Sequence, residues 1–434
     1  MNLPRHEEYK DSGVNWLGNI PTQWTTARLK SKVSLITEKA SQRTHPVALE
    51  NIESWSGRFI PTEGDFEGDG IAFVAGDLLF GKLRPYLAKA YLACNSGEAV
   101  GDFHVLRPNK TLDSRFFQYQ VLNKSFIDIT DGSTFGSKMP RASWEFLGNM
   151  PLALPSLDEQ RIVAAFLDRE TAKIDALIAE QEKLIDLLAE KRQATISHAV
   201  TRGLDPSAPM KDSGVAWLGE VPAHWKIKRM KHLVREGIAG PYGSSLTKSM
   251  YEASGYRVYG QQQVIPDNFS IGDYYISDIK FAEMSRYRVK PDDVLISVMG
   301  TIGRAAVVPT DAEPGIINPR LVLYRVINDL IFPRYLQCFL NNSTSQRYFS
   351  LAAQGTTMEG LNMVTVGELY VALPPLNEQV EILELIRQEE LKINQLLAES
   401  ARAIALLKER RSALIAAAVT GQIDVRGIAE ESTA

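Results

Sequence analysis

Two long stretches of the chain carry apolar residues at helical spacing. In the first, alternate steps of three and four residues fall on positions 167, 170, 174, 177, 181, 184 and 188. The second stretch repeats the pattern at 386, 389, 393, 396, 400, 403 and 407, with polar residues at the same two steps. This spacing predicts two long antiparallel helices that pack on each other as a coiled coil, with two separate core helices as the alternative.

Short apolar runs separated by glycine, proline and asparagine fill the segments outside these helices. They predict strands at 71–74, 77–80, 90–93, 103–106, 293–298, 305–308 and 321–324. A helical piece closes each set, at 114–123 and at 333–342. The expected fold is α/β (α+β): two similar mixed α/β domains, separated by the paired helices and related by a pseudo-two-fold axis.

Two phrases of the sequence occur twice. The anchor phrase Lys10-Asp-Ser-Gly-Val-Asn-Trp-Leu-Gly-Asn-Ile-Pro-Thr-Gln-Trp24 returns, slightly changed, between Lys211 and Trp225. The entry phrase Leu152-Ala-Leu-Pro-Ser-Leu-Asp-Glu-Gln160 returns as Val371-Ala-Leu-Pro-Pro-Leu-Asn-Glu-Gln379 and leads into the second long helix. In the first copy, Ser156 and Glu159 fit a capping box. A tandem repeat of this kind predicts four segments, with bounds 1–151, 152–205, 206–370 and 371–434.

Composition indicates a soluble globular protein with more than one core. The 434 residues are 44% hydrophobic and 23% charged, and no run of 18 apolar residues occurs. The first residues lack the apolar stretch of a signal peptide. Cys94 and Cys338 are expected to be buried thiols rather than a disulfide, as in a reducing cytoplasm. The net charge of −4 hides a local basic run, residues 226–235.

Catalytic motifs are missing from the sequence. There is no phosphate-binding G-x-x-x-x-G-K-[ST] loop and no Asp/Asn-Pro-Pro-aromatic turn, and the six histidines lack metal-ligand spacing. We therefore expect a non-catalytic chain that binds no metal and no cofactor. An enzyme with an unfamiliar site would need catalytic groups at equivalent places in both blocks, and none stands out.

The repeated anchor and entry phrases resemble those of the specificity subunit of type I restriction-modification systems, over nearly the whole chain. The resemblance implies two target-recognition domains, 1–151 and 206–370, and two conserved helices, 152–205 and 371–434. It implies an asymmetric two-part site in double-stranded DNA, with each half read by one domain. The rival interpretation is a helical scaffold that carries two protein-binding modules and has no DNA role.

The resemblance also implies partners. Two methylation subunits would dock on the helical frame, and restriction subunits would join the full complex in a bacterial or archaeal cytoplasm. S-adenosylmethionine, ATP and Mg would bind to those partners. The assembly would act as a DNA adenine methyltransferase and an ATP-dependent endonuclease.

Candidate DNA contacts lie in loops that resemble the DNA-facing loops of that family. Arginine and lysine suit guanine edges and phosphates, and glutamine suits adenine. The candidates in the two blocks are Lys82, Arg84, Lys138, Arg141, Tyr242, Ser244, Lys248, Gln261, Gln262, Gln263, Arg304 and Arg320. Residues expected at the helix frame and subunit interfaces are Glu159, Gln160, Glu378 and Gln379.

Overall fold

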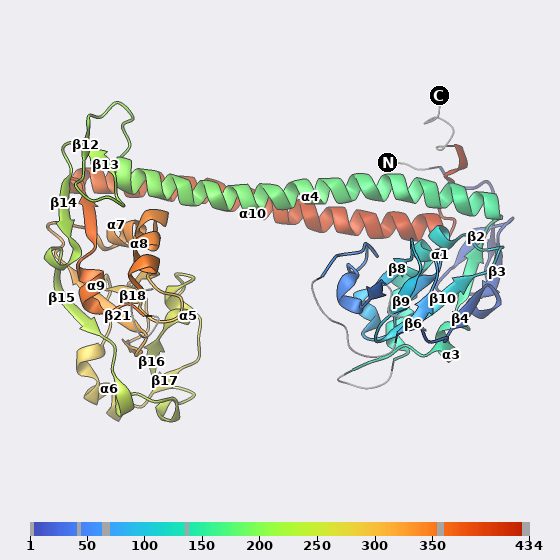
Figure 1. The fold of residues 1–434 in the computed structure, drawn as a ribbon, viewed down its shortest axis with the longest axis horizontal. Coiled ribbons are helices and arrows are strands. Elements are labelled where there is room, and N and C mark those ends of the chain that lie inside the picture. Colours follow the sequence, from blue (N-terminus) through green and yellow to red (C-terminus); the bar gives the residue numbers. More distant parts are fainter. Residues whose placement is uncertain (1–3, 41–44, 63–69, 135–138, 354–359, 428–434) are drawn as a thin grey trace. The chain divides into compact units, whose positions relative to one another are not determined.

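The computed structural model describes residues 4–40, 45–62, 70–134, 139–353 and 360–427. The chain forms two compact units, each described by itself below. Unit 1 comprises residues 1–182 and 401–434, and unit 2 comprises residues 183–400 (Figure 1). Helices α4 (Leu157–Arg202) and α10 (Leu376–Val419) each contribute residues to both units.

Unit 1 is built on a four-stranded antiparallel sheet. Its order is β4 (Val33–Ile36), β10 (Phe103–Pro108), β7 (Leu78–Gly81) and β8 (Ala90–Leu92). All four residues of β7 are buried, which explains why its sequence is a continuous apolar run.

In the part of unit 1 that the structure describes, the remaining strands form three small sheets, and three short α-helices accompany them. The small sheets pair β1 (Tyr9–Asp11) with β2 (Asn19–Pro21), β3 (Thr25–Arg28) with β11 (Pro151–Leu154), and β9 (Gly97–Ala99) with both β5 (Pro46–Val47) and β6 (Ile71–Phe73). The helices are α1 (Ser114–Val121), α2 (Lys124–Gly132) and α3 (Trp144–Leu147).

Unit 2 repeats the same sheet. Its strands are β15 (Val234–Ala239), β21 (Leu321–Val326), β18 (Val294–Ser297) and β19 (Ala305–Val307), in the order β15-β21-β18-β19. Small sheets pair β12 (Met210–Asp212) with β13 (Glu220–Pro222), β14 (Lys226–Arg229) with β22 (Tyr370–Leu373), and β16 (Tyr256–Tyr259) with both β17 (Tyr275–Ile276) and β20 (Gly315–Ile317). The helices are α5 (Gln261–Val264), α6 (Asp278–Glu283), α7 (Pro333–Asn341), α8 (Ser343–Ala353) and α9 (Met363–Gly367). The predicted α/β class, strands and helical pieces are confirmed.

The two long helices pack together as predicted, but their contact seam lies one residue away at alternate steps. Within unit 1, Thr171 and Ile178 are buried, whereas the predicted Leu177 is 48% exposed. Within unit 2, Leu396 is 42% exposed although Ile393 is buried. Successive residues of a helix turn by about 100°, so steps of three and of four both follow the seam. The Thr171 hydroxyl donates to the Leu167 carbonyl at 2.7 Å, which allows a polar residue to be buried there.

Each anchor phrase ends in a tryptophan that binds the glutamate of the entry phrase. Trp24 and Trp225 are fully buried, and their Nε1 groups donate to Glu159 Oε1 and Glu378 Oε1, each at 3.0 Å. The expected capping box is therefore only half formed. Ser156 Oγ accepts from the Glu159 amide, but the Glu159 carboxylate turns to Trp24.

The glutamine of each entry phrase joins three segments of its unit. The Gln160 side chain accepts from the Asp113 amide at 2.8 Å and donates to the carbonyls of Thr111 and Pro155. The Gln379 side chain makes the same three bonds, to Phe332, Leu330 and Pro374. Both side chains are buried inside their own unit, where they hold the start of each long helix against the neighbouring loops.

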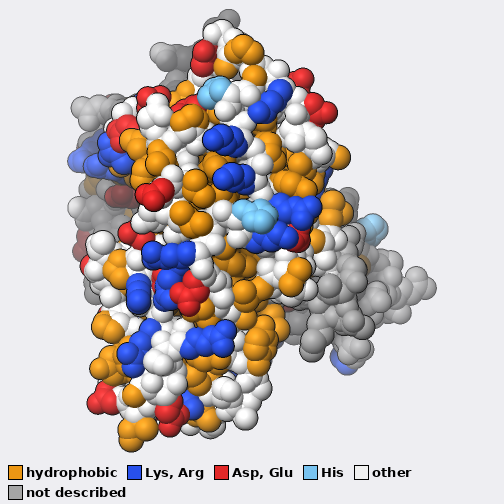
Figure 2. All heavy atoms as spheres, turned by 90° about the vertical axis from the view of Figure 1, so that its left-hand side faces the viewer, with side chains coloured by type: hydrophobic (Ala, Val, Ile, Leu, Met, Phe, Trp, Pro, Cys, Tyr) orange, Lys and Arg blue, Asp and Glu red, His pale blue; other side chains and the backbone are white. Residues whose placement is uncertain are grey.

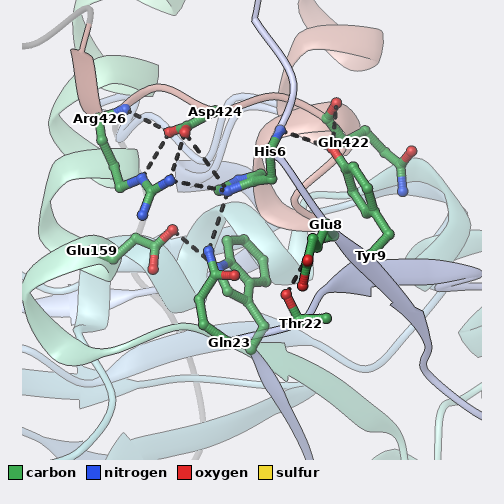
Figure 3. A network of polar contacts seen from close by, with 10 residues as sticks. His6, Glu8, Tyr9, Thr22, Gln23, Glu159, Gln422, Asp424 and Arg426 are labelled. Atoms are coloured by element: carbon green, nitrogen blue, oxygen red, sulfur yellow. Dashed lines mark hydrogen bonds and ion pairs between the residues drawn. The ribbon is translucent and has the colours of Figure 1, made fainter.

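In unit 1 this junction is completed by segments from both ends of the chain (Figure 3). The Asp424 amide donates to the Pro4 carbonyl at 2.8 Å, and the Tyr9 hydroxyl donates to the Gln422 carbonyl. Arg426 Nη2 lies 2.6 Å from the Asp424 carboxylate, and this hydrogen bond lowers the pKa of Asp424. Buried His6 lies 3.7 Å from the same carboxylate.

Two further findings concern the composition-based expectations. Cys338 is buried, and burial raises the pKa of its thiol to about 12. Cys94 is exposed, so its expected burial is wrong; it lies in the turn after β8 rather than inside the sheet. Within the described ranges, no helix is long and apolar enough to cross a bilayer.

Candidate nucleic-acid interface

Three segments of unit 1 meet where strand β7 ends. The Lys82 amide donates to the Asp102 carbonyl at 2.8 Å, and the Ala142 amide donates to the Lys82 carbonyl at 2.9 Å. Leu83 and Arg141 form a β-bridge. Residues 82–84, 102 and 140–142 are called the turn edge of unit 1. This backbone pairing brings Lys82, Arg84 and Arg141, which are separated in the sequence, into one place.

A carboxylate lies between two of these cations. Arg141 donates to both oxygens of Asp102, from Nε and from Nη2, at 3.0 Å each. The hydrogen bonds to Asp102 raise the pKa of Arg141. Lys82 Nζ lies 3.8 Å from the same carboxylate. Arg141 and Lys82 are therefore pre-arranged by Asp102, a residue that the sequence analysis missed.

Arg84 is held differently. Its φ of 51° lies in the left-handed region, and its amide donates to the Pro140 carbonyl at 2.9 Å. Its guanidinium is exposed and has no hydrogen-bond or ion-pair partner among the residues that the structure describes. A non-glycine residue in this conformation is strained, and such strain persists where the surrounding structure fixes it. Lys138 lies outside the described residues.

A histidine beneath the turn edge secures segment 140–142. His104, in β10, is buried, and its Nε2 bonds the Ala142 carbonyl at 2.9 Å. Burial lowers the pKa of His104, so the neutral ring donates this bond at neutral pH. The backbone on both sides of Arg141 is therefore fixed by hydrogen bonds, at Pro140 and at Ala142.

Unit 2 forms a turn edge with the same backbone contacts. The Val298 amide donates to the Arg320 carbonyl at 3.0 Å, and the Leu361 amide donates to the Val298 carbonyl at 2.8 Å. Met299 and Gly360 form the matching β-bridge. By these contacts, Val298 corresponds to Lys82, Arg320 to Asp102 and Gly360 to Arg141. Side chains at corresponding places therefore differ in size and in charge.

Two of the predicted residues of unit 2 meet at this edge. The side-chain Nε2 of Gln261 donates to the Met299 carbonyl and to the Thr301 carbonyl, the latter at 3.2 Å. The side-chain Oε1 of Gln261 accepts from Arg320 Nη1 at 3.4 Å. Arg304 is exposed at the start of β19, and its carbonyl accepts from Ser297 at 2.8 Å. Arg304 therefore closes the turn between β18 and β19.

The predicted DNA contact of Gln263 does not agree with the structure. Its side chain is fully buried, accepts from the Gly260 amide and donates to the Ile271 carbonyl, each at 2.8 Å. Both ends of the amide bond backbone groups of the same unit, and the burial of the side chain keeps it away from a base. Neighbouring Gln262 is exposed.

The remaining predicted residues lie on the segment that follows β15. This segment leaves the sheet beside the turn edge, where a Cβ on Gly240 would lie 2.0 Å from the Asn318 carbonyl oxygen. Only glycine allows this approach. Beyond it Tyr242 is 67% exposed, and Ser244 and Lys248 are exposed.

The basic run 226–235 lies at the other end of the sheet. Val234 pairs with Val326 and Ala239 with Val322, so the run is separated from Arg320 by the length of β21. Figure 2 shows the face of unit 2 that carries β14 and β15, where Lys and Arg side chains lie among hydrophobic ones. Arg229 and Lys231 both pair with Glu368. This run is therefore a surface apart from the turn edge.

Comparison with known proteins identifies the family. A model of the type I restriction modification DNA specificity domain matches residues 90–186 and 247–400, together more than half of the chain. The chain belongs to this family.

Similar proteins cover much of its length. The type I restriction enzyme StySPI specificity subunit of Salmonella potsdam is 22% identical over 95% of this chain and 92% of its own. The EcoBI specificity subunit of Escherichia coli is 22% identical over 73% of this chain and 67% of its own.

Solved structures share the fold. One chain, from a structure on complex assembly and conformational transition of the type I R-M system, matches with a TM-score of 0.72 at 18% identity, covering 92% of this chain and 98% of its own. The HsdS subunit from Thermoanaerobacter tengcongensis matches with a TM-score of 0.52 at 19% identity, covering 93% and 98%. Across the described part of this specificity-family chain, no group of three or more His, Cys, Asp or Glu is placed to hold a metal.

Proposed function

We propose that this specificity subunit reads an asymmetric two-part site in double-stranded DNA, with one half-site per unit, and catalyses no reaction itself. The supporting observation is the pair of turn edges, in which one backbone arrangement carries unlike side chains. Half-sites of different sequence require a common mount with different reading groups. In this proposal the two target-recognition domains span residues 1–151 and 206–370. The two helical segments span residues 152–205 and 371–434.

The DNA contacts of the proposal are the exposed or half-buried candidates. They are Lys82, Arg84 and Arg141 for one half-site, and Tyr242, Ser244, Lys248, Gln261, Gln262, Arg304 and Arg320 for the other. Exposed cations on a structured edge suit phosphates and guanine edges, and the Gln261 and Gln262 amides suit adenine. Lys138 stays a sequence-based candidate.

The chemistry of the complex is assigned to partner subunits. Methylation subunits would bind S-adenosylmethionine, and restriction subunits would use ATP and Mg. This division agrees with a sequence that contains neither a phosphate-binding loop nor the methyltransferase turn. A bacterial or archaeal cytoplasm, where the DNA lies, is the proposed location.

Exchange of one block tests the assignment. Residues 25–151 are replaced by the corresponding block of a family member of different specificity, and the chimaera is assembled with its methylation subunits. Methylation sequencing should show one new half-site and one unchanged half-site. A change in both halves, or in neither, would contradict the one-unit-one-half-site proposal.

The rival interpretation, a scaffold with two protein-binding modules, is tested by the salt dependence of DNA binding. Binding of duplex DNA by the wild-type complex should weaken steeply as salt rises, because each phosphate contact releases counterions. Absence of DNA binding at low salt, with the complex assembled, would favour two protein-binding modules instead.

A further inference from the structure

Both units contain a side-on arginine–aspartate pair at the same place in the sheet. In unit 1, Arg107 donates from Nε and Nη2 to Asp77, each at 2.7 Å. In unit 2, Arg325 binds Asp293 through the same two nitrogens, at 3.0 and 3.3 Å. Asp77 and Asp293 are 1% and 3% exposed. A pair that recurs in two otherwise unlike units belongs to the common frame.

The pair of Arg141 and Asp102 has the same side-on geometry but occurs in unit 1 alone. Unit 2 has Gly360 and Arg320 at the corresponding positions, and it still forms the same backbone hydrogen bonds and the same β-bridge. The fold therefore does not require this second pair. A side-chain arrangement that the frame can omit is free to serve recognition.

Among the residues that the structure describes, none bonds the second edge of the Arg141 guanidinium. A guanidinium carries five N–H donors in a planar fork. Asp102 takes the hydrogen on Nε and one hydrogen on Nη2. The Nη1–Nη2 edge keeps two parallel donors, and the Arg141 side chain is 49% exposed. Two parallel donors match the O6 and N7 acceptors of guanine in the major groove.

We propose that Arg141 reads a guanine in the half-site of unit 1 and that Asp102 is the positioning residue that holds its fork rigid. The inference rests on the proposed function and adds the base that is read. Long arginine side chains lose rotamer freedom on binding, and a partner that fixes them beforehand reduces that cost.

Lys82 completes the arrangement. A lone carboxylate near DNA would repel phosphates, but Asp102 is flanked by Arg141 and by Lys82, at 3.8 Å. The group of three therefore carries one net positive charge at neutral pH. Asp102 can hold Arg141 without making the turn edge repel DNA.

The test uses the full chain assembled with its methylation subunits and a pool of duplexes randomised in the half-site. Arg141→Ala should relax one G·C pair only, by on the order of 5- to 150-fold, which equals about 1–3 kcal/mol per bidentate contact. Arg141→Lys keeps the charge but loses the fork, so it should relax the same pair while the affinity for non-specific DNA stays close to wild type.

Asp102→Asn separates positioning from packing. It removes a negative charge, so non-specific affinity should stay equal or rise, while discrimination at the Arg141 base pair falls. A merely structural role would lower both together. In the double variant with Arg141→Ala, Asp102→Asn should add no further loss of discrimination.

Arg107→Ala is the matched control, because it breaks a pair of the same geometry in the same unit. It should lower thermal stability and leave every base preference unchanged. The inference would be overturned if Arg141→Ala weakened binding equally for all sequences. It would also be overturned if Asp102→Asn left the base preference unchanged. Failure of the wild-type complex to bind duplex DNA would instead refute the proposed function.

Discussion

The turn edges of the two units differ in charge while their backbones agree. In unit 1 the carboxylate of Asp102 lies between two cations, whereas unit 2 has Arg320 at that backbone position and a glutamine beside it. Main-chain hydrogen bonds and one β-bridge form this edge in both units, and they do not use the side chains at positions 82, 102 and 141 or at 298, 320 and 360. Side chains at these positions are therefore free to change in size and sign without loss of the fold.

A second difference lies at the junction of anchor and helix. In unit 1 the segments that carry His6 and Arg426 lie near Glu159 (Figure 3). In unit 2 Gly203, His224 and Glu378 line a cavity of about 260 Å³, and His224 approaches the Glu378 carboxylate to 2.7 Å. The same tryptophan–glutamate bond is thus supported in two ways.

The largest expected effect is the loss of stability when the arginine of the recurring arginine–aspartate pair is removed. This loss should differ between the two units. Arg325 is 12% exposed and also binds Glu236, so Arg325→Leu leaves Asp293 buried and unpaired. The free energy of unfolding of unit 2 should fall by about 3–5 kcal/mol. Arg107 is 42% exposed, and water can replace it in part, so Arg107→Leu should cost unit 1 about 1–3 kcal/mol.

Hydrogen exchange of amides in each unit measures both costs separately. Equal losses in the two units, or a larger loss for Arg107→Leu, would contradict the dependence on burial.

Patterns of period and repetition were enough to predict most of the fold. The continuous apolar runs became β7 and β18 because those strands are buried on both faces. The seam of the paired helices was misplaced because Leu177 and Leu184 are each followed by an isoleucine, and two neighbouring apolar residues do not reveal which of them faces the partner helix. A polar residue such as Thr171 enters the seam only by bonding its own backbone, which a hydrophobic pattern does not reveal.

The next effect compares the two anchor tryptophans. Trp24→Phe removes the indole donor and leaves the buried Glu159 carboxylate without that bond, which should cost about 1–3 kcal/mol. Trp225→Phe should cost less, at the lower end of about 1–3 kcal/mol, because Glu378 keeps His224.

Denaturation of each variant, followed by unit-resolved hydrogen exchange, gives the two values. In Trp225→Phe combined with His224→Ala, the cost should rise toward that of Trp24→Phe. If His224→Ala added nothing, the compensation by His224 would be wrong.

The candidate interface was less predictable than the fold. Loop cations such as Lys82 and Arg141 come together only through a β-bridge between distant segments, and no local pattern marks Asp102 as their partner. Gln263 was indistinguishable in sequence from its two neighbouring glutamines. A short helix turns successive side chains in different directions, and this one points inward to the Ile271 carbonyl.

The smallest effect at neutral pH concerns the histidine beneath one turn edge. Unit 2 has Val322 where unit 1 has His104, so only unit 1 should gain a proton-linked term here. Burial lowers the pKa of His104, so the folded state binds this proton less readily than the unfolded state. Stability from this group is fully present above the unfolded pKa of about 6.5 and is lost as pH falls through it toward the lowered folded pKa. The difference in unfolding free energy between wild type and His104→Val, measured in unit 1 from about pH 8 to pH 5, should therefore move against the wild type on acidification. A difference that stays flat over this range would show that the buried ring takes up its proton as easily as a free histidine.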